Sequence, residues 1–238
     1  MTTALVFAGG TGLRMNTHAK PKQFLELHGK PVIIYTLEHF EIHPLIDNII
    51  VVCLESWIME LRHLIKRYAI DKVSQIIPGG DRGDRSIYNG LWSLEDVCAQ
   101  DDIILIHDGV RPLINADLIT ANIEKVKECG NAITIDHATE TVIRIDSSNQ
   151  IIDVPPRWET YHAKAPQSFR YGDIWNLYKR AMKDDKVAID SSHLCAIYDV
   201  KMHTVQSTPN NLKITSPADY YIFRALYEAM ENEQILGL

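Results

Sequence analysis

Glycines and positively charged residues are concentrated in one short stretch near the N-terminus. Gly9, Gly10 and Gly12 directly follow a short apolar run that is typical of a buried parallel strand. Arg14 and Lys22 then bring two fixed positive charges to the same stretch. Glycine lets a ligand approach the backbone closely, and exposed backbone N–H groups in such a turn form an anion-binding concavity. This combination predicts a site that binds phosphate groups.

Two common phosphate-binding motifs do not fit this stretch. A P-loop requires Lys followed by Ser or Thr after its glycines, and neither pair is present here. The dinucleotide fingerprint G-x-G-x-x-G would start at Gly10 and would need a third glycine where Met15 stands. One alternative stays open, in which the glycines serve packing alone and the side chains of Arg14 and Lys22 are solvated.

Two further loops, 78–86 and 107–112, also follow apolar segments directly. The carboxyl ends of parallel strands meet at one edge of a sheet, and ligands bind beyond that edge. We therefore expect the loops 8–22, 78–86 and 107–112 to face one cleft.

The elements that position these loops alternate between strands and helices. Apolar runs and helical periodicity predict strands at 4–8, 48–54, 73–77 and 102–106, and helices after Pro31 and near 57–68, 85–97, 115–129 and 173–183, with a last helix after Ser216. Such alternation implies right-handed βαβ crossovers. We expect an α/β fold, with a Rossmann-like, doubly wound and mostly parallel sheet.

The region 137–161 interrupts this alternation. Two apolar segments, 141–145 and 150–154, flank the turn sequence D-S-S-N with no helix between them, which is a hairpin signature. We expect a protruding β-hairpin arm. Because a two-stranded hairpin alone is marginally stable in water, this arm needs a partner.

Composition restricts the class of protein. A chain of 238 residues with 46% hydrophobic residues suits one domain, 1–238, that contains the arm. The net charge of −7 provides no basic field for nucleic acid or an anionic membrane. Neither a signal-peptide pattern nor 18 consecutive apolar residues occurs, and four cysteines are scattered without a C-x-x-C pair. We expect a soluble, cytoplasmic protein with reduced thiols.

Several motifs occur in one order along nearly the whole chain. They are A-G-G-x-G-x-R-M, P-K-Q-F, the segment Gly79–Ser86, H-D-x-x-R-P at 107–112, Thr141, Arg157, P-Q-S-F at 166–169 and N-L-K-I-T at 211–215. This order resembles the cytidylyltransferases that act on 2-C-methyl-D-erythritol 4-phosphate and on D-ribitol 5-phosphate. The resemblance implies transfer of a cytidylyl group from CTP to an alcohol phosphate, with release of pyrophosphate. It also implies Mg²⁺ as cofactor and a homodimer that exchanges the 137–161 arms.

The resemblance implies roles for the charged residues. Arg14 and Lys22 would hold the triphosphate, and Lys213 would stabilise the α-phosphate in the transition state. Asp108 would coordinate Mg²⁺, a cation that takes one or two carboxylates plus phosphate oxygens. Such chemistry depends on positioning and cationic stabilisation rather than on a covalent protein intermediate.

The resemblance also divides the remaining site residues between nucleotide and acceptor. Arg111, Thr141 and Arg157 would bind the acceptor phosphate, with Arg157 supplied by the neighbouring subunit. The residues that would bind the nucleotide are Ala8, Gly9, Gly10, Gly12, Gly80, Asp81 and Ser86.

Simpler roles stay open for several charged residues. Asp108 could cap the following turn, and Arg157 could be a solvated arm residue. Lys213 could extend its ammonium to solvent past its apolar neighbours.

Four other polar residues attract attention without a defined role. We interpret His107, which follows a core strand, as structural, and His162 and His193 as too isolated to be ligands. Asp190 fits a structural and a substrate-orienting role equally well.

The acceptor side departs from the methylerythritol pattern. Glu140 replaces the usual aspartate before Thr141, Pro156 precedes Arg157 where aspartate is usual, and Ala165 lacks the usual threonine hydroxyl. These changes favour D-ribitol 5-phosphate as acceptor, with 2-C-methyl-D-erythritol 4-phosphate second. The first would serve a cell-wall polysaccharide and the second isoprenoid synthesis.

Two other classes of protein remain as rivals. A non-catalytic nucleotide-binding sensor would keep the glycine loops but would not need Lys22, Asp108 and Lys213 together. A dinucleotide-dependent oxidoreductase would want the third glycine that Met15 replaces.

Overall fold

The computed structural model describes residues 1–10 and 20–236, with side chains as far as Asn232. Its main sheet has seven strands in the order β11-β7-β10-β6-β1-β4-β5. These are β1 (Thr2–Ala8), β4 (Asn48–Cys53), β5 (Val73–Pro78), β6 (Ile103–Asp108), β7 (Asn131–His137), β10 (Tyr161–Arg170) and β11 (Thr204–Gln206). Only β10 runs antiparallel to its neighbours, β6 and β7. The predicted mostly parallel, doubly wound sheet is confirmed.

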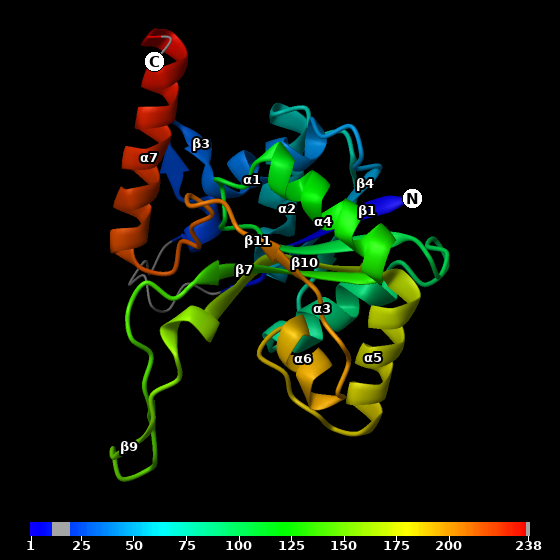
Figure 1. Ribbon diagram of the computed structural model, residues 1–238. Coiled ribbons are helices and arrows are strands. Elements are labelled where there is room, and N and C mark those ends of the chain that lie inside the picture. Colours follow the sequence, from blue (N-terminus) through cyan, green and yellow to red (C-terminus); the bar gives the residue numbers. More distant parts are fainter. Residues whose placement is uncertain (11–19, 237–238) are drawn as a thin grey trace.

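Helices cover both faces of this sheet (Figure 1). One face carries α1 (Val32–Glu41), α2 (Ile58–Arg67) and α4 (Ala116–Cys129), and the other carries α3 (Gly83–Trp92), α5 (Tyr171–Lys183) and α6 (Ser191–Ile197). Successive side chains of a strand point to opposite faces. Accordingly, Ala4 and Val6 of β1 belong to the core under α1, whereas Leu5 belongs to the core against α3. Both cores therefore fix the position of β1 and of the loop that follows it.

Local sequence explains where two helices begin. The Asn115 side chain accepts a hydrogen bond from the Leu118 N–H at 3.0 Å, which makes it the predicted N-cap of α4. Asp219 accepts from the Ser216 N–H at 2.7 Å, and Ser216 Oγ accepts in return from the Asp219 N–H at 3.4 Å. This reciprocal capping box starts α7 (Pro217–Leu236), as predicted.

Two element predictions were wrong in extent. α3 ends at Trp92 rather than near Val97, because the N–H groups of Leu94 and Val97 turn back to carbonyls three residues earlier. The helix predicted at 173–183 begins at Tyr171.

The strands β7 and β10 were missing from the prediction. Polar residues and Pro166 interrupt the apolar pattern of β10, and proline cannot donate to a ladder. The register with β7 shifts between Ala163 and Gln167, at that proline.

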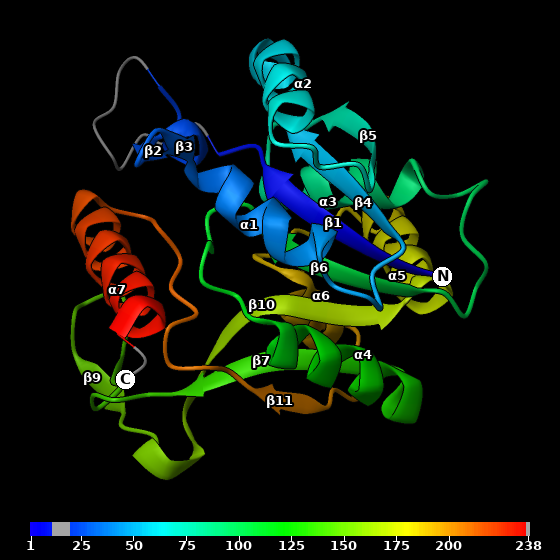
Figure 2. The same ribbon diagram turned by 90° about the horizontal axis from the view of Figure 1, so that it is seen from above.

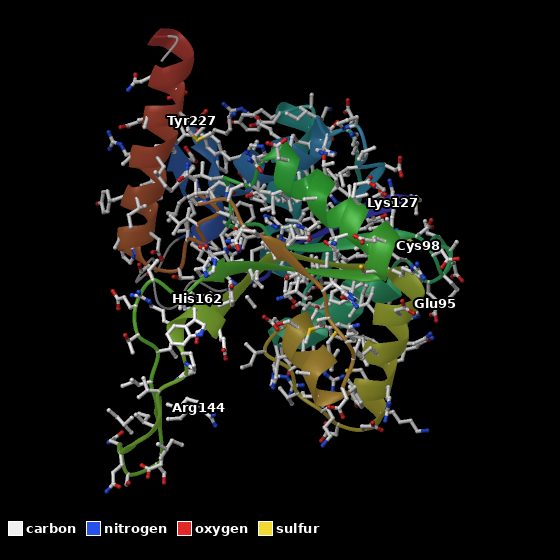
Figure 3. The ribbon with its side chains drawn as sticks, viewed as in Figure 1. Glu95, Cys98, Lys127, Arg144, His162 and Tyr227 are labelled. Carbon is white, nitrogen blue, oxygen red and sulfur yellow. The ribbon has the colours of Figure 1, made fainter. Side chains whose placement is uncertain are left out.

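The region 137–161 projects from the body as a hairpin arm (Figure 1), and the view from above shows it on the same side of the molecule as α7 (Figure 2). Its strands β8 (Arg144–Ile145) and β9 (Ile151–Asp153) pair only with each other, and η4 (Arg157–Glu159) follows. Arg144 lies far out on the arm and His162 lies at its root (Figure 3). The predicted protruding hairpin is confirmed. The arm exposes the apolar side chains of Ile143, Ile145, Ile151, Ile152, Val154 and Trp158.

The C-terminal helix α7 stands beside the body and packs on α1 (Figure 1). The rings of Phe223 and Tyr227 lie 5.5 Å and 4.9 Å from the ring of Tyr35, edge to face. The remaining short elements are β2 (Glu26–Leu27), β3 (Lys30–Pro31), η2 (Lys22–Phe24) and η3 (Glu55–Trp57). Within the described ranges, every helix is too short or too polar to cross a membrane.

Candidate active site

A cavity of about 480 Å³ opens at the carboxyl edge of the sheet. Gly9 and Gly10 line it after β1, Gly80 and Asp81 after β5, and Asp108 at the end of β6. The other lining residues are Phe7, Arg82, Gly83, Ser86, Ile87, Ile106, His107, Arg111, Ala163, Lys164, Ala165, Gln167, Ile189, Asp190, Ser191 and Lys213. The prediction that three loops face one cleft is therefore confirmed.

Asp108 lies between two cations in this cavity. Its Oδ1 accepts from Lys213 Nζ at 2.7 Å, and its Oδ2 accepts from Arg111 Nε at 2.8 Å. Burial would raise the pKa of the Asp108 carboxyl, but the charges and hydrogen bonds of Lys213 and Arg111 outweigh it and hold the pKa well below its usual range. Asp108 is therefore ionised at any physiological pH, and the three side chains carry a net charge of +1.

Backbone contacts bring Lys213 to a residue 105 positions earlier. The Ile214 N–H donates to the Val110 carbonyl at 2.9 Å. The Arg111 guanidinium donates to the Asn211 carbonyl at 3.1 Å. Asn211 itself is fully buried and donates from Nδ2 to the Ala165 carbonyl at 2.7 Å. The segment 211–214 is thus held against both the turn that follows β6, at Val110 and Arg111, and strand β10.

The loop after β5 is shaped by Ser86. Ser86 Oγ accepts from the Gly80 N–H at 3.0 Å and donates to the Arg82 carbonyl at 3.0 Å. A Cβ on Gly80 would lie 2.4 Å from Arg85 Cβ, so this close turn requires glycine. The Ser86 side chain therefore fixes the conformation of this loop beside the cavity.

The glycines after β1 have a different explanation. A Cβ on Gly9 or Gly10 would meet Ser86 Oγ or Lys22 Cε at an ordinary 3.7 Å, and neither glycine has a positive φ. Packing against the described residues therefore does not require glycine at these positions, which argues against a packing-only role.

The end of β1 is held by a residue that the sequence reasoning did not single out. Gln23 is almost fully buried, and its Nε2 donates to the carbonyls of Ala8 at 2.6 Å and Gly10 at 3.2 Å. Its presence in the P-K-Q-F motif was the available signal. Ala8 is buried below the loop rather than lining the cavity, and Lys22 lies in η2 with its Cε near Gly10.

Some predicted site residues are not brought to this cavity. Thr141 and Arg157 are exposed on the arm, away from the residues that line the cavity of the same subunit. Gly12 and Arg14 lie outside the described residues.

The interpretation of His107 as structural is supported by its surroundings. Its ring is buried edge to face against Phe40 at 5.2 Å, and burial lowers its pKa to about 3. His107 is therefore neutral at physiological pH.

Asp190 caps a helix at the cavity wall. Its Oδ1 accepts from the His193 N–H at 2.8 Å, and its Oδ2 accepts from Gln167 Nε2 at 3.0 Å. The structure thus gives Asp190 a positioning role between α6 and β10. The sequence did not indicate roles for two other cavity-lining residues, Gln167 and Lys164. The Lys164 Nζ lies 2.7 Å from Asp136 Oδ2.

The residues present fit a divalent cation that arrives with phosphate. In the part of the chain that the structure describes, no three His, Cys, Asp or Glu side chains gather as a metal centre. Mg²⁺ needs no such cluster when phosphate oxygens and water supply most of its ligands. Asp108, an ionised carboxylate at the cavity wall, can provide the single protein oxygen.

The family model of IspD, 2-C-methyl-D-erythritol 4-phosphate cytidylyltransferase, matches residues 2–228. The chain belongs to this family. It is therefore a nucleotidyltransferase, an enzyme of the cytidylyltransferase class, as the motif order predicted.

Relatives within the family differ in their named acceptor. The chain is 48% identical to the ribitol-5-phosphate cytidylyltransferase of Vibrio parahaemolyticus and 46% identical to that of Streptococcus agalactiae serotype Ia, over 100% of each chain. It is 33% identical to the 2-C-methyl-D-erythritol 4-phosphate cytidylyltransferase of Clostridium botulinum, over 96% of this chain and 98% of that one. The crystal structure of 4-diphosphocytidyl-2C-methyl-D-erythritol synthase from Anaerococcus prevotii superposes with a TM-score of 0.81 at 25% identity. That superposition covers 95% of this chain and 98% of the other.

Proposed function

We propose that this cytidylyltransferase converts D-ribitol 5-phosphate and CTP to CDP-ribitol and pyrophosphate. The observation that carries the proposal is the cavity in which the glycine loops meet the cluster of Asp108, Arg111 and Lys213. Full-length relatives at 46–48% identity that are named for ribitol 5-phosphate favour that acceptor over methylerythritol phosphate.

The reaction joins an oxygen of the acceptor phosphate to the α-phosphorus of CTP. As that bond forms, the bond from the α-phosphorus to the bridging oxygen breaks, and pyrophosphate leaves with the electron pair. Charge spreads over the phosphoryl oxygens in such a transition state, so fixed cations lower the barrier. In this proposal Lys213 would stabilise the α-phosphoryl oxygens, and Arg14 and Lys22 would hold the triphosphate.

The glycine loops would bind the nucleotide mainly through the backbone. Gly9, Gly10, Gly80 and Asp81 line the cavity, and Ser86 fixes the conformation of the second loop. Small residues leave room for a pyrimidine and little for a purine. Mg²⁺ at Asp108 would neutralise triphosphate charge.

The acceptor would bind between this cluster and the wall that β10 forms. Lys164 and Ala165 of β10 line the cavity, and Ile189 lines it as well. Arg111 lines the cavity beside Asp108, while Thr141 and Arg157 are on the arm. We infer that a second subunit supplies the arm residues, because the arm exposes apolar side chains that two short strands cannot bury.

We further infer that the protein works in the cytoplasm, where CTP is available. The thiols of Cys53 and Cys195 are free and buried.

Parallel assays of pyrophosphate release test the proposal. The enzyme is given CTP, Mg²⁺ and one acceptor: D-ribitol 5-phosphate, 2-C-methyl-D-erythritol 4-phosphate or glycerol 3-phosphate. We expect the highest kcat/KM with D-ribitol 5-phosphate. A preference for 2-C-methyl-D-erythritol 4-phosphate would instead assign the enzyme to isoprenoid synthesis. CTP binding without turnover of any acceptor would favour a nucleotide-binding sensor.

A further inference from the structure

The Asp108 carboxylate can bind either the cationic side chains beside it or a divalent metal ion. Lys213 Nζ already lies 2.7 Å from Oδ1, and Arg111 Nε lies 2.8 Å from Oδ2. A divalent cation bound to this carboxylate would therefore share an oxygen with an ammonium or a guanidinium. Lys213 and the metal compete for Asp108.

The two cations differ in how firmly they are held. Arg111 is almost completely buried and also donates to the Asn211 carbonyl, so its position is fixed from two sides. The Lys213 side chain is 39% exposed, and Asp108 is its sole partner among the described residues. Lys213 is thus the cation that can leave the carboxylate without breaking a second contact.

The charge of the cluster opposes direct metal binding. One carboxylate and two cations sum to +1, so a divalent cation approaching Asp108 meets net repulsion. A triphosphate, in contrast, is attracted to the same cluster. An ammonium on a flexible four-carbon stem can turn from the carboxylate to a phosphate oxygen.

We propose that Lys213 keeps divalent cations off Asp108 until a nucleoside triphosphate draws the ammonium away. This inference rests on the proposed function, because it assigns Lys213 a second role at the same site. The order of binding follows: the carboxylate accepts a divalent cation only together with the triphosphate. The enzyme therefore has little affinity for free metal.

Binding of Mn²⁺, measured from the electron paramagnetic resonance signal of the free ion, tests this with the full-length chain. We expect weak binding by the wild type alone and strong retention when CTP is added. Lys213→Met removes the ammonium but keeps an unbranched side chain, and it should bind Mn²⁺ without nucleotide about tenfold or more tightly than the wild type. Lys213→Arg keeps the positive charge and should bind as weakly as the wild type.

Lys164→Met is the matched control. Lys164 also lines the cavity and also pairs with an aspartate, Asp136, at 2.7 Å. Its removal should leave Mn²⁺ affinity unchanged. The double variant Lys213→Met with Asp108→Asn should lose the new affinity, which locates the metal at Asp108. Thermal unfolding of each variant confirms that it is folded.

Two results would overturn the inference. One is tight Mn²⁺ binding by the wild type without nucleotide, abolished by Asp108→Asn. The other is an unchanged, weak affinity in folded Lys213→Met. The proposed function fails separately: it would be contradicted if the wild type did not bind CTP with Mn²⁺ and did not release pyrophosphate.

Discussion

The cavity at the sheet edge and the arm are built in opposite ways. At the sheet edge, Asp108 ends β6, whose side chains pack into both cores, and Arg111 pairs with Asp108 and donates to the segment 211–214. The arm has two strands of two and three residues, and its Arg157 and Thr141 are exposed.

This difference divides the predicted site residues into those that a single chain positions and those that it leaves exposed. The cluster around Asp108 has its geometry fixed inside a single subunit. In the proposed dimer, the arm residues gain a defined surrounding from the second subunit. We therefore expect changes at the sheet edge to act on the chemical step, and changes on the arm to act on acceptor binding.

Lys213→Ala should have the largest effect. It removes the cation expected to act in the transition state, so kcat should fall by about 10² to 10³, the range for loss of one such donor. Steady-state pyrophosphate release measures this, with thermal unfolding to show that the variant is folded. Lys127→Ala is the control, because Lys127 is exposed on α4, pairs with Glu124 at 2.8 Å and does not line the cavity. An equal loss of kcat in both variants would contradict a special role for Lys213.

Arg157→Ala should act on the acceptor. Loss of a charged hydrogen bond, worth roughly 1.5–3 kcal/mol, predicts a rise of about 10- to 100-fold in KM for the acceptor, with CTP affinity unchanged. The control is Arg144→Ala, since Arg144 is also exposed on the arm but pairs with Asp153 at 3.2 Å. If Arg144→Ala raised KM as much as Arg157→Ala, the arm would act through its folding and not through Arg157.

Gly80→Ala should destabilise the loop 78–86, which follows β5. Its Cβ would lie 2.4 Å from Arg85 Cβ, and such crowding costs about 1–3 kcal/mol. Gly83→Ala, where nothing lies within 4 Å of the new Cβ, should be neutral or slightly stabilising. Urea unfolding and CTP titration of both variants check this. Equal behaviour of the two would show that the loop adjusts freely.

The ionised state of Asp108 predicts a modest dependence of stability on pH. Its folded pKa is depressed by Lys213 and Arg111 against the effect of burial, so its contribution is fully present above about pH 4, the unfolded value. The contribution decreases as pH falls from there toward the folded pKa. The difference in unfolding free energy between the wild type and Asp108→Asn should be constant from pH 5 to 8 and shrink below pH 4. A difference that changed near neutrality would contradict this assignment.

The sequence predicted the sheet edge well for a physical reason. Buried parallel strands such as β4 are continuous apolar runs, and the loops after them must share one edge. Motif order supplied Lys213, whose approach to Asp108 no local pattern could indicate.

Other features depend on contacts between distant parts of the chain. β10 contains polar residues because its first part is exposed and it also lines the cavity, so its pattern is neither alternating nor apolar. The role of Gln23 depends on the fold, which brings its side-chain amide within hydrogen-bond distance of the carbonyls of Ala8 and Gly10. Thr141 and Arg157 could be assigned only through the family, because a single subunit does not place them.

The exposed indole of Trp158 gives the arm an optical signal. It is 75% exposed at η4, whereas Trp175 is buried and Trp57 stacks on Phe24 at 4.5 Å. Covering Trp158 moves it from water into an apolar setting, which shifts tryptophan fluorescence to shorter wavelength. Trp92, which is also exposed, can be replaced by phenylalanine, so that Trp158 is the largely exposed indole among the three that remain. For the proposed dimer, dilution of that variant would then follow the arm leaving its partner in real time, without an added dye.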